Sequence, residues 1–125
     1  NPEKAQAAYR HALELLPNHA RARYNRGLDA LQRGEPAAAL PDLEAAFRHD
    51  PFLRDARLQA ARAASAAGVR VDEAIAWVEE ALADNDADPA AWLALEAIYA
   101  RHGPPEKLAA VRARLREMGI PGAGS

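Results

Sequence analysis

A spaced signature recurs along this chain of 125 residues at an interval of 34 residues. It consists of Ala, a Tyr or Leu four positions later, Ala three positions after that, and Pro five further on. The copies are Ala5, Tyr9, Ala12, Pro17 and Ala39, Leu43, Ala46, Pro51, and the partial copy Ala74, Val78, Ala81 follows 35 residues later. A period of this length is typical of helix pairs that bury their apolar faces by stacking on further copies.

Glycines follow the same period. Gly34, Gly68 and Gly103 each come after an Ala-rich segment of helical composition. We predict a helix end before each of them, because Gly adopts the left-handed C-cap conformation easily. Seven positions earlier stand Gly27, Ala61 and Glu96. The first two are small enough for close helix packing, whereas the Glu breaks the pattern.

With these landmarks the chain resembles the tetratricopeptide repeat family, in particular bacterial proteins of that family or fragments of them. The family pairs a W-x2-L-G-x2-Y first helix with an A-x3-F-x2-A-x4-P second helix. The best copy here runs from Tyr24 to Pro51, and Trp92, Leu95 and Tyr99 keep the first-helix spacing. Arg26 departs from the pattern, since the family usually has Leu there.

The resemblance implies an all-α fold, a right-handed superhelical stack (solenoid) of antiparallel helix pairs with about 3.5 repeats. We expect seven helices, at residues 2–16, 20–33, 36–49, 53–67, 72–83, 89–102 and 105–118. The expected repeat domain is 1–119, divided into a truncated repeat (2–19), repeats 20–53 and 54–88, and a divergent repeat (89–119), before a disordered tail (120–125). Because the first helix matches the second half of a repeat, the chain is expected to be a fragment of a longer array or a protein with an unusual start.

Both ends of such a stack would expose apolar side chains, which favours self-association. The residues concerned are Tyr9, Leu13 and Leu16 at one end and Leu108, Val111, Leu115 and Met118 at the other. Inside the helix expected at 36–49, Pro41 removes a backbone donor, at a cost of about 3 kcal/mol. We expect a tolerated kink there, with a functional hinge as the alternative.

Composition limits the classes of function. Half of the residues are apolar, 6% are aromatic and the net charge is -2, so no global charge attracts nucleic acid or an anionic membrane. The absence of Cys excludes disulfides and thiolate metal sites. No apolar run approaches the roughly 20 residues that span a bilayer. We expect a soluble protein of the cytoplasm or periplasm.

Residues that could carry chemistry are few. Asp84, Asp86 and Asp88 imitate the start of a calcium loop, but Pro89 replaces its Gly and Leu95 its final Glu. Asp88 is better explained as the N-cap of the next helix. The four His residues form no i, i+4 metal pair, and no triad or phosphate-binding glycine loop is visible. We therefore expect no enzyme activity, no metal and no cofactor.

Charge alternates between the helices of each expected pair. Residues 20–34 carry four Arg against one Asp, and residues 51–67 carry three Arg against one Asp. Residues 35–50 carry four acids against one Arg, and residues 68–88 carry seven acids against one Arg. First helices are thus basic and second helices acidic.

In the family that the chain resembles, first helices line a concave groove, so the resemblance implies a basic groove here. Its expected residues are Arg21, Tyr24, Asn25 and Leu28, then Leu58, Gln59 and Arg62 beside Asp55, then Leu93 and Arg101. On each helix they follow an i, i+3, i+4, i+7 stripe. Arg21 and Arg62 would bind carboxylates, Tyr24 and Leu58 would hold apolar groups, and Asn25 and Gln59 would bond the peptide backbone. Alternatively, these residues only solvate and pack amphipathic helices.

Two specialised groove types of the family fit poorly. The chaperone-docking clamp has an Asn that Asn25 matches, but Asp55 and Gln59 stand where it needs cations. The Asn ladder of glycosyltransferase-linked repeats fades here to Asn25, Gln59 and Ala94. The expected function is a non-catalytic scaffold that binds a peptide or protein segment, with an acidic one favoured. The alternatives are an accessory domain that recruits substrate to a larger enzyme, and a chaperone for exported proteins.

Overall fold

The computed structural model describes residues 2–15 and 19–121, which form seven helices and no strand. The helices are α1 (Pro2–Leu15), α2 (Ala20–Gln32), α3 (Pro36–His49), α4 (Arg54–Ala67), α5 (Val71–Asp84), α6 (Pro89–His102) and α7 (Pro105–Glu117). The predicted all-α class and the seven helices are confirmed. Pro at the start of α3, α6 and α7 suits the first helical turn, where no intrahelical donor is required.

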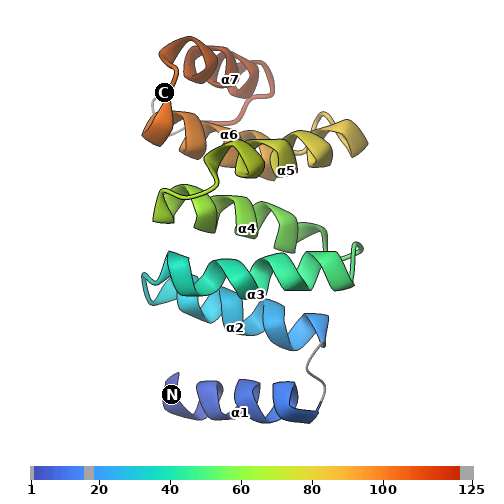
Figure 1. The fold of residues 1–125 in the computed structure, drawn as a ribbon. Coiled ribbons are helices and arrows are strands. Elements are labelled where there is room, and N and C mark those ends of the chain that lie inside the picture. The colour runs from blue at the N-terminus through green and yellow to red at the C-terminus, as the bar shows by residue number, and fades with distance from the viewer. Residues whose placement is uncertain (1, 16–18, 122–125) are drawn as a thin grey trace.

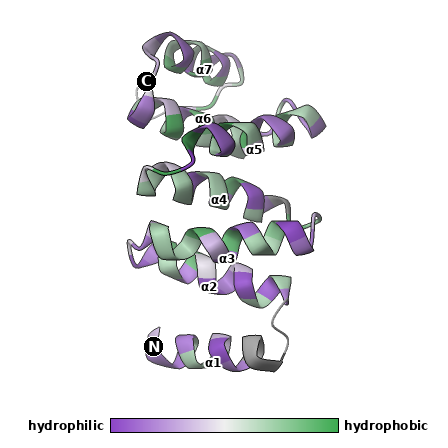
Figure 2. Cartoon of the chain, in the orientation of Figure 1, coloured by the Kyte–Doolittle hydropathy of each residue, from purple (hydrophilic) through white to green (hydrophobic). Residues whose placement is uncertain are grey.

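The helices stack in chain order from α1 at one end to α7 at the other, so the N- and C-terminal helices lie far apart (Figure 1). Every helix packs against the next, and α4 packs in addition against α2 and α6. Around the helices, hydrophobic and hydrophilic positions alternate (Figure 2), as expected for helices that bury one side. The architecture is thus mostly sequential helix packing.

The central helix, α4, is rich in Ala because it has neighbours on several sides. It contacts α2, α3, α5 and α6. Its fully buried residues are Ala56, Ala60, Ala61, Ala63 and Ala64. A methyl side chain lets a neighbouring helix approach closely without losing helix propensity. α4 therefore links the two halves of the stack.

Gly27 marks the closest approach of α2 to α3. A Cβ built on Gly27 would lie 2.6 Å from Cγ of Leu43, a side chain that is fully buried. The small residue predicted at this place is therefore required by packing. α3 itself continues without interruption through Pro41.

Left-handed glycines end the predicted helices. Gly34 and Gly68 have φ of 76° and 73°, and the residue after each donates its N–H to a carbonyl five positions back. Gly103 also caps its helix, with φ of 71°. Ile120 donates to the carbonyl of Leu115 and packs against the core, so this residue of the expected tail belongs to the packed structure. Residues 122–125 lie outside the described ranges.

Two buried carboxylates join helix pairs. Asp42 of α3 accepts hydrogen bonds of 2.7 and 2.6 Å from Nε and Nη2 of Arg26 on α2. Glu96 of α6 accepts one of 3.3 Å from Nε of Arg112 on α7. The Arg comes first along the chain in one pair and the carboxylate comes first in the other, but the partners are 16 positions apart in both pairs. Arg26, which departs from the family pattern, and Glu96, which breaks the small-residue pattern, thus have partners in the next helix.

Long side chains bridge α3 and α5. Phe47 and Trp77 pack edge to face with ring centroids 5.2 Å apart. The guanidinium of Arg70, in the turn before α5, bonds both carboxylate oxygens of Glu44 at 2.7 and 2.8 Å and also bonds Glu73. Hydrogen bonds from Arg70, aided by Arg48, lower the pKa of Glu44 from 4.5 to about 2 although burial opposes the shift.

The C-terminal end of the stack differs from the expectation. Val111 and Leu115 are buried, because they point from α7 toward α6, and Leu108 and Met118 are half-buried. The predicted exposed stripe on α7 is therefore wrong. Tyr9 is half-buried on α1, whereas the side chain of Leu13 and the whole of Leu16 lie outside the described part. Within the described ranges, no helix has the length and apolarity needed to cross a bilayer.

Candidate binding surface

The nine predicted groove residues occur on α2, α4 and α6, and we call the surface that they define the α2/α4/α6 face. Its members are Arg21, Tyr24, Asn25 and Leu28 on α2, Leu58, Gln59 and Arg62 on α4, and Leu93 and Arg101 on α6. The three arginines are exposed, and five others are half-buried. Leu58 is only 5% exposed and belongs to the core, so most of this predicted anchor is already covered.

Side chains of α2 and α4 meet on this face. The hydroxyl of Tyr24 donates to Oδ2 of Asp55, and Nε2 of Gln59 lies 3.4 Å from the same oxygen. The guanidinium of Arg21 lies 5.8 Å from the centre of the Tyr24 ring. Burial, followed by the bond to Asp55, raises the pKa of Tyr24 to about 12, so at neutral pH its phenol remains a donor. The two stripes therefore share one surface, although the polar groups of Tyr24 and Gln59 already have partners.

Much of the positive charge of α2 is neutralised nearby. Arg26 and Arg23 approach the Asp42 carboxylate to 2.6 and 3.7 Å. Arg33 lies 3.0 Å from Asp29 and 3.6 Å from Glu35. The charge count of the helix therefore overstates the field that α2 offers a ligand.

Arg62 and Arg101 differ from these arginines in their surroundings. Both are exposed, and in residues 2–15 and 19–121 neither forms an ion pair. They occupy the later turns of α4 and α6. These two guanidinium groups therefore keep their donors for a ligand carboxylate or for water.

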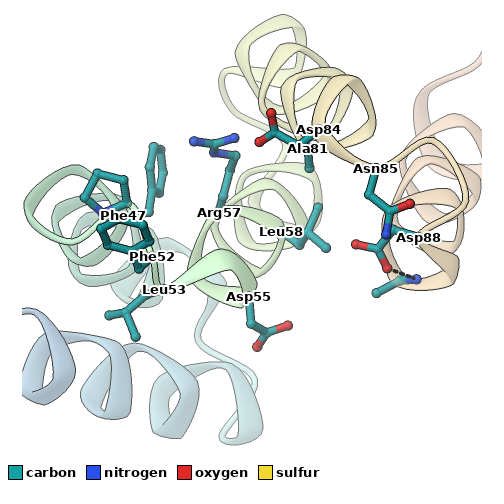
Figure 3. A pocket seen from close by; sticks show the side chains of 12 residues that line it. Phe47, Phe52, Leu53, Asp55, Arg57, Leu58, Ala81, Asp84, Asn85 and Asp88 are labelled. Atoms are coloured by element: carbon teal, nitrogen blue, oxygen red, sulfur yellow. Dashed lines mark hydrogen bonds between the residues drawn. The ribbon is translucent and has the colours of Figure 1, made fainter.

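A cavity of about 450 Å³ opens at the other end of the face, between the α3–α4 and α5–α6 turns (Figure 3). Its apolar lining includes Phe47, Pro51, Phe52, Leu53 and Leu58. Phe52 is 90% exposed, which is unusual for so large an apolar side chain. This cavity was not predicted from the sequence, although the apolar Pro51 and Phe52 in an expected turn were a signal for it.

The polar lining of the cavity is mostly acidic. It comprises Asp55, Arg57, Asp84, Asn85 and Asp88. Figure 3 shows Phe47 and Phe52 on one side and Asp84, Asn85 and Asp88 on the other, with Arg57 between them. The Arg57 guanidinium lies 5.8 Å from the centre of the Phe47 ring. Three carboxylates thus surround a partly apolar space that holds one guanidinium.

The polar side chains of the α5–α6 turn stabilise the local backbone. Oδ1 of Asp88 accepts the N–H of Ala90 at 3.0 Å, which confirms the predicted N-cap of α6. Oδ1 of Asn85 accepts the N–H of Ala87 at 3.1 Å. In the described part of the chain, no three His, Asp or Glu residues are arranged to hold a metal ion.

Comparison with models of known protein families and with curated protein sequences found no match.

Proposed function

We propose that this chain is a tetratricopeptide-like solenoid that acts as a non-catalytic binding module for a protein segment. The recurrence at 34 residues supports the proposal, because it repeats whole helix pairs rather than single helices. The packing of α4 against both α2 and α6 also supports it, since first helices of stacked pairs contact one another. The α2/α4/α6 face would then be the concave side.

The observation that carries the binding proposal is the unpaired state of two exposed arginines on one face. Arg62 and Arg101 lack an acidic partner in the described ranges, while Arg23, Arg26 and Arg33 have one. Arg donors match carboxylates in geometry, and two arginines without an acidic partner favour an acidic segment. Arg21 adds a third positive charge at the start of α2.

Selection from a phage-displayed library of random linear peptides tests this function. The intact chain should enrich peptides containing Asp or Glu, and their affinity should fall with rising salt. The double variant Arg62→Glu, Arg101→Glu should weaken the selected peptides by more than about tenfold, or 1.4 kcal/mol.

The matched control is Arg10→Glu with Arg116→Glu, which reverses two exposed charges on α1 and α7. It should leave the affinities unchanged. Equal loss in both double variants would mean that only net charge matters, and the proposed site would be wrong. Failure of the intact chain to enrich acidic peptides would overturn the acidic specificity.

A further inference from the structure

We propose that the cavity between the α3–α4 and α5–α6 turns receives a cationic side chain, Lys or Arg, from the bound segment. The inference rests on the proposed function for the segment that delivers the side chain. It extends that function by assigning a second specificity, opposite in charge, to the other end of the α2/α4/α6 face.

The size and the lining of the cavity suit a long side chain with a charged end. About 450 Å³ lies within the range of pockets that bind small organic groups. Pro51 and Leu53 offer apolar surface to a methylene stem, and Phe52 offers an exposed aromatic face. A cation packs favourably over such a face. An aliphatic stem with a positive end would therefore contact compatible groups along its whole length.

Charge complementarity decides between a cationic occupant and a neutral apolar one. Asp55, Asp84 and Asp88 outnumber the single cation of the lining, Arg57. Asp55 and Asp88 already accept internal hydrogen bonds. Asp84 has no such partner in the described residues and is exposed on the last turn of α5. Its carboxylate is thus the group best able to bind an incoming cation.

The two ends of the face would then fix the direction of the segment. Leu58, at the cavity, and Arg62 are one helical turn apart, about 6 Å along α4. Ala90, also at the cavity, and Arg101 are separated by about 16 Å along α6. An extended segment rises about 3.3 Å per residue, so its acidic residue should lie about two to five positions from the basic one.

Titration of the protein with single capped amino acids tests the cavity without the segment. The probes are the N-acetyl amides of arginine, norleucine and glutamate, and the readout is the backbone amide shifts of Phe52 and Asn85 in NMR spectra. The arginine probe should shift both amides saturably and bind about two- to fivefold more tightly than the norleucine probe, as for an exposed ion pair. The glutamate probe should be the weakest.

Asp84→Asn should abolish the preference for arginine over norleucine. The fold should persist, because removing a negative charge from a helix C-terminus is not destabilising. The matched control is Asp86→Asn, which makes the same change in the adjoining turn at an exposed residue outside the cavity lining. It should retain the preference.

Three results would overturn the proposal: equal or tighter binding of norleucine, no shift at Phe52 and Asn85 with any probe, or an unchanged preference in Asp84→Asn. These results are independent of peptide selection. Acidic peptides could still be enriched through Arg62 and Arg101 if the cavity failed this test, and the cavity could bind arginine if that selection failed.

Discussion

At the scale of single residues, Asp42 is a buried carboxylate that needs a cationic partner. It is 5% exposed and depends on Arg26, which is partly exposed. Arg26→Met should cost about 2–4 kcal/mol in urea unfolding, because it leaves most of a buried charge uncompensated. Asp42→Asn should cost only about 1 kcal/mol, since Arg26 can turn toward water. The reverse order would show that Arg23 alone can hold the carboxylate.

Glu44 should make the stability of the fold depend on pH. Its pKa in the folded chain is about 2, below its ordinary value of 4.5, so its pairing stabilises the fold above about pH 4.5. That contribution should be lost progressively as the pH falls through about 2. In Glu44→Gln, the urea midpoint should depend less on pH in this window than in the unchanged chain. Glu80→Gln, at an exposed position of α5, is the control and should keep the full dependence.

At the scale of elements, the contact between α2 and α3 depends on the missing side chain of Gly27. Ala is the better helix former by about 1 kcal/mol, but its Cβ would lie 2.6 Å from the buried Leu43 side chain. Overpacking of this kind costs about 1–3 kcal/mol, so Gly27→Ala should be net destabilising. In a Leu43→Ala background the same change should become stabilising, because the space is then open. Chemical denaturation of the four proteins measures this reversal, and additive effects would refute it.

The elements could be predicted well because their signals are local. Gly34 and Gly68 end helices by a conformation that suits Gly, and Asp88 caps its own helix two residues on. The partner of Arg26 could not be predicted, because it lies 16 positions away on the next helix. Val111 and Leu115 were assigned to the wrong environment for a similar reason, since their burial depends on how α7 rests on α6.

At the scale of the whole molecule, the sequence indicates some features of the proposed binding surface and not others. The recurrence places equivalent stripes on α2, α4 and α6, and the contact of Tyr24 with Asp55 joins two of them. The apolar turn at Pro51 and Phe52 was visible in the sequence, but the cavity itself could not be predicted from it. The cavity is formed by two turns about 35 residues apart, and their spacing depends on the packing of α3, α4 and α5. The pairing of Arg23, Arg26 and Arg33 was missed for the same reason, so the charge count alone exaggerated the basic character of α2.

Sequential packing also predicts that stability is local along the stack. α7 packs on α6 alone among the described helices, whereas α3 packs on α2 and α4. Leu115→Ala, which should cost about 2–5 kcal/mol, should therefore lower amide protection against hydrogen exchange in α6 and α7 and leave α2 and α3 nearly unchanged. Leu43→Ala should lower protection from α2 through α4, because Leu43 is fully buried next to α2. If Leu115→Ala instead reduced protection equally in all helices, the chain would unfold as one cooperative unit, and chain-order packing would not divide its stability.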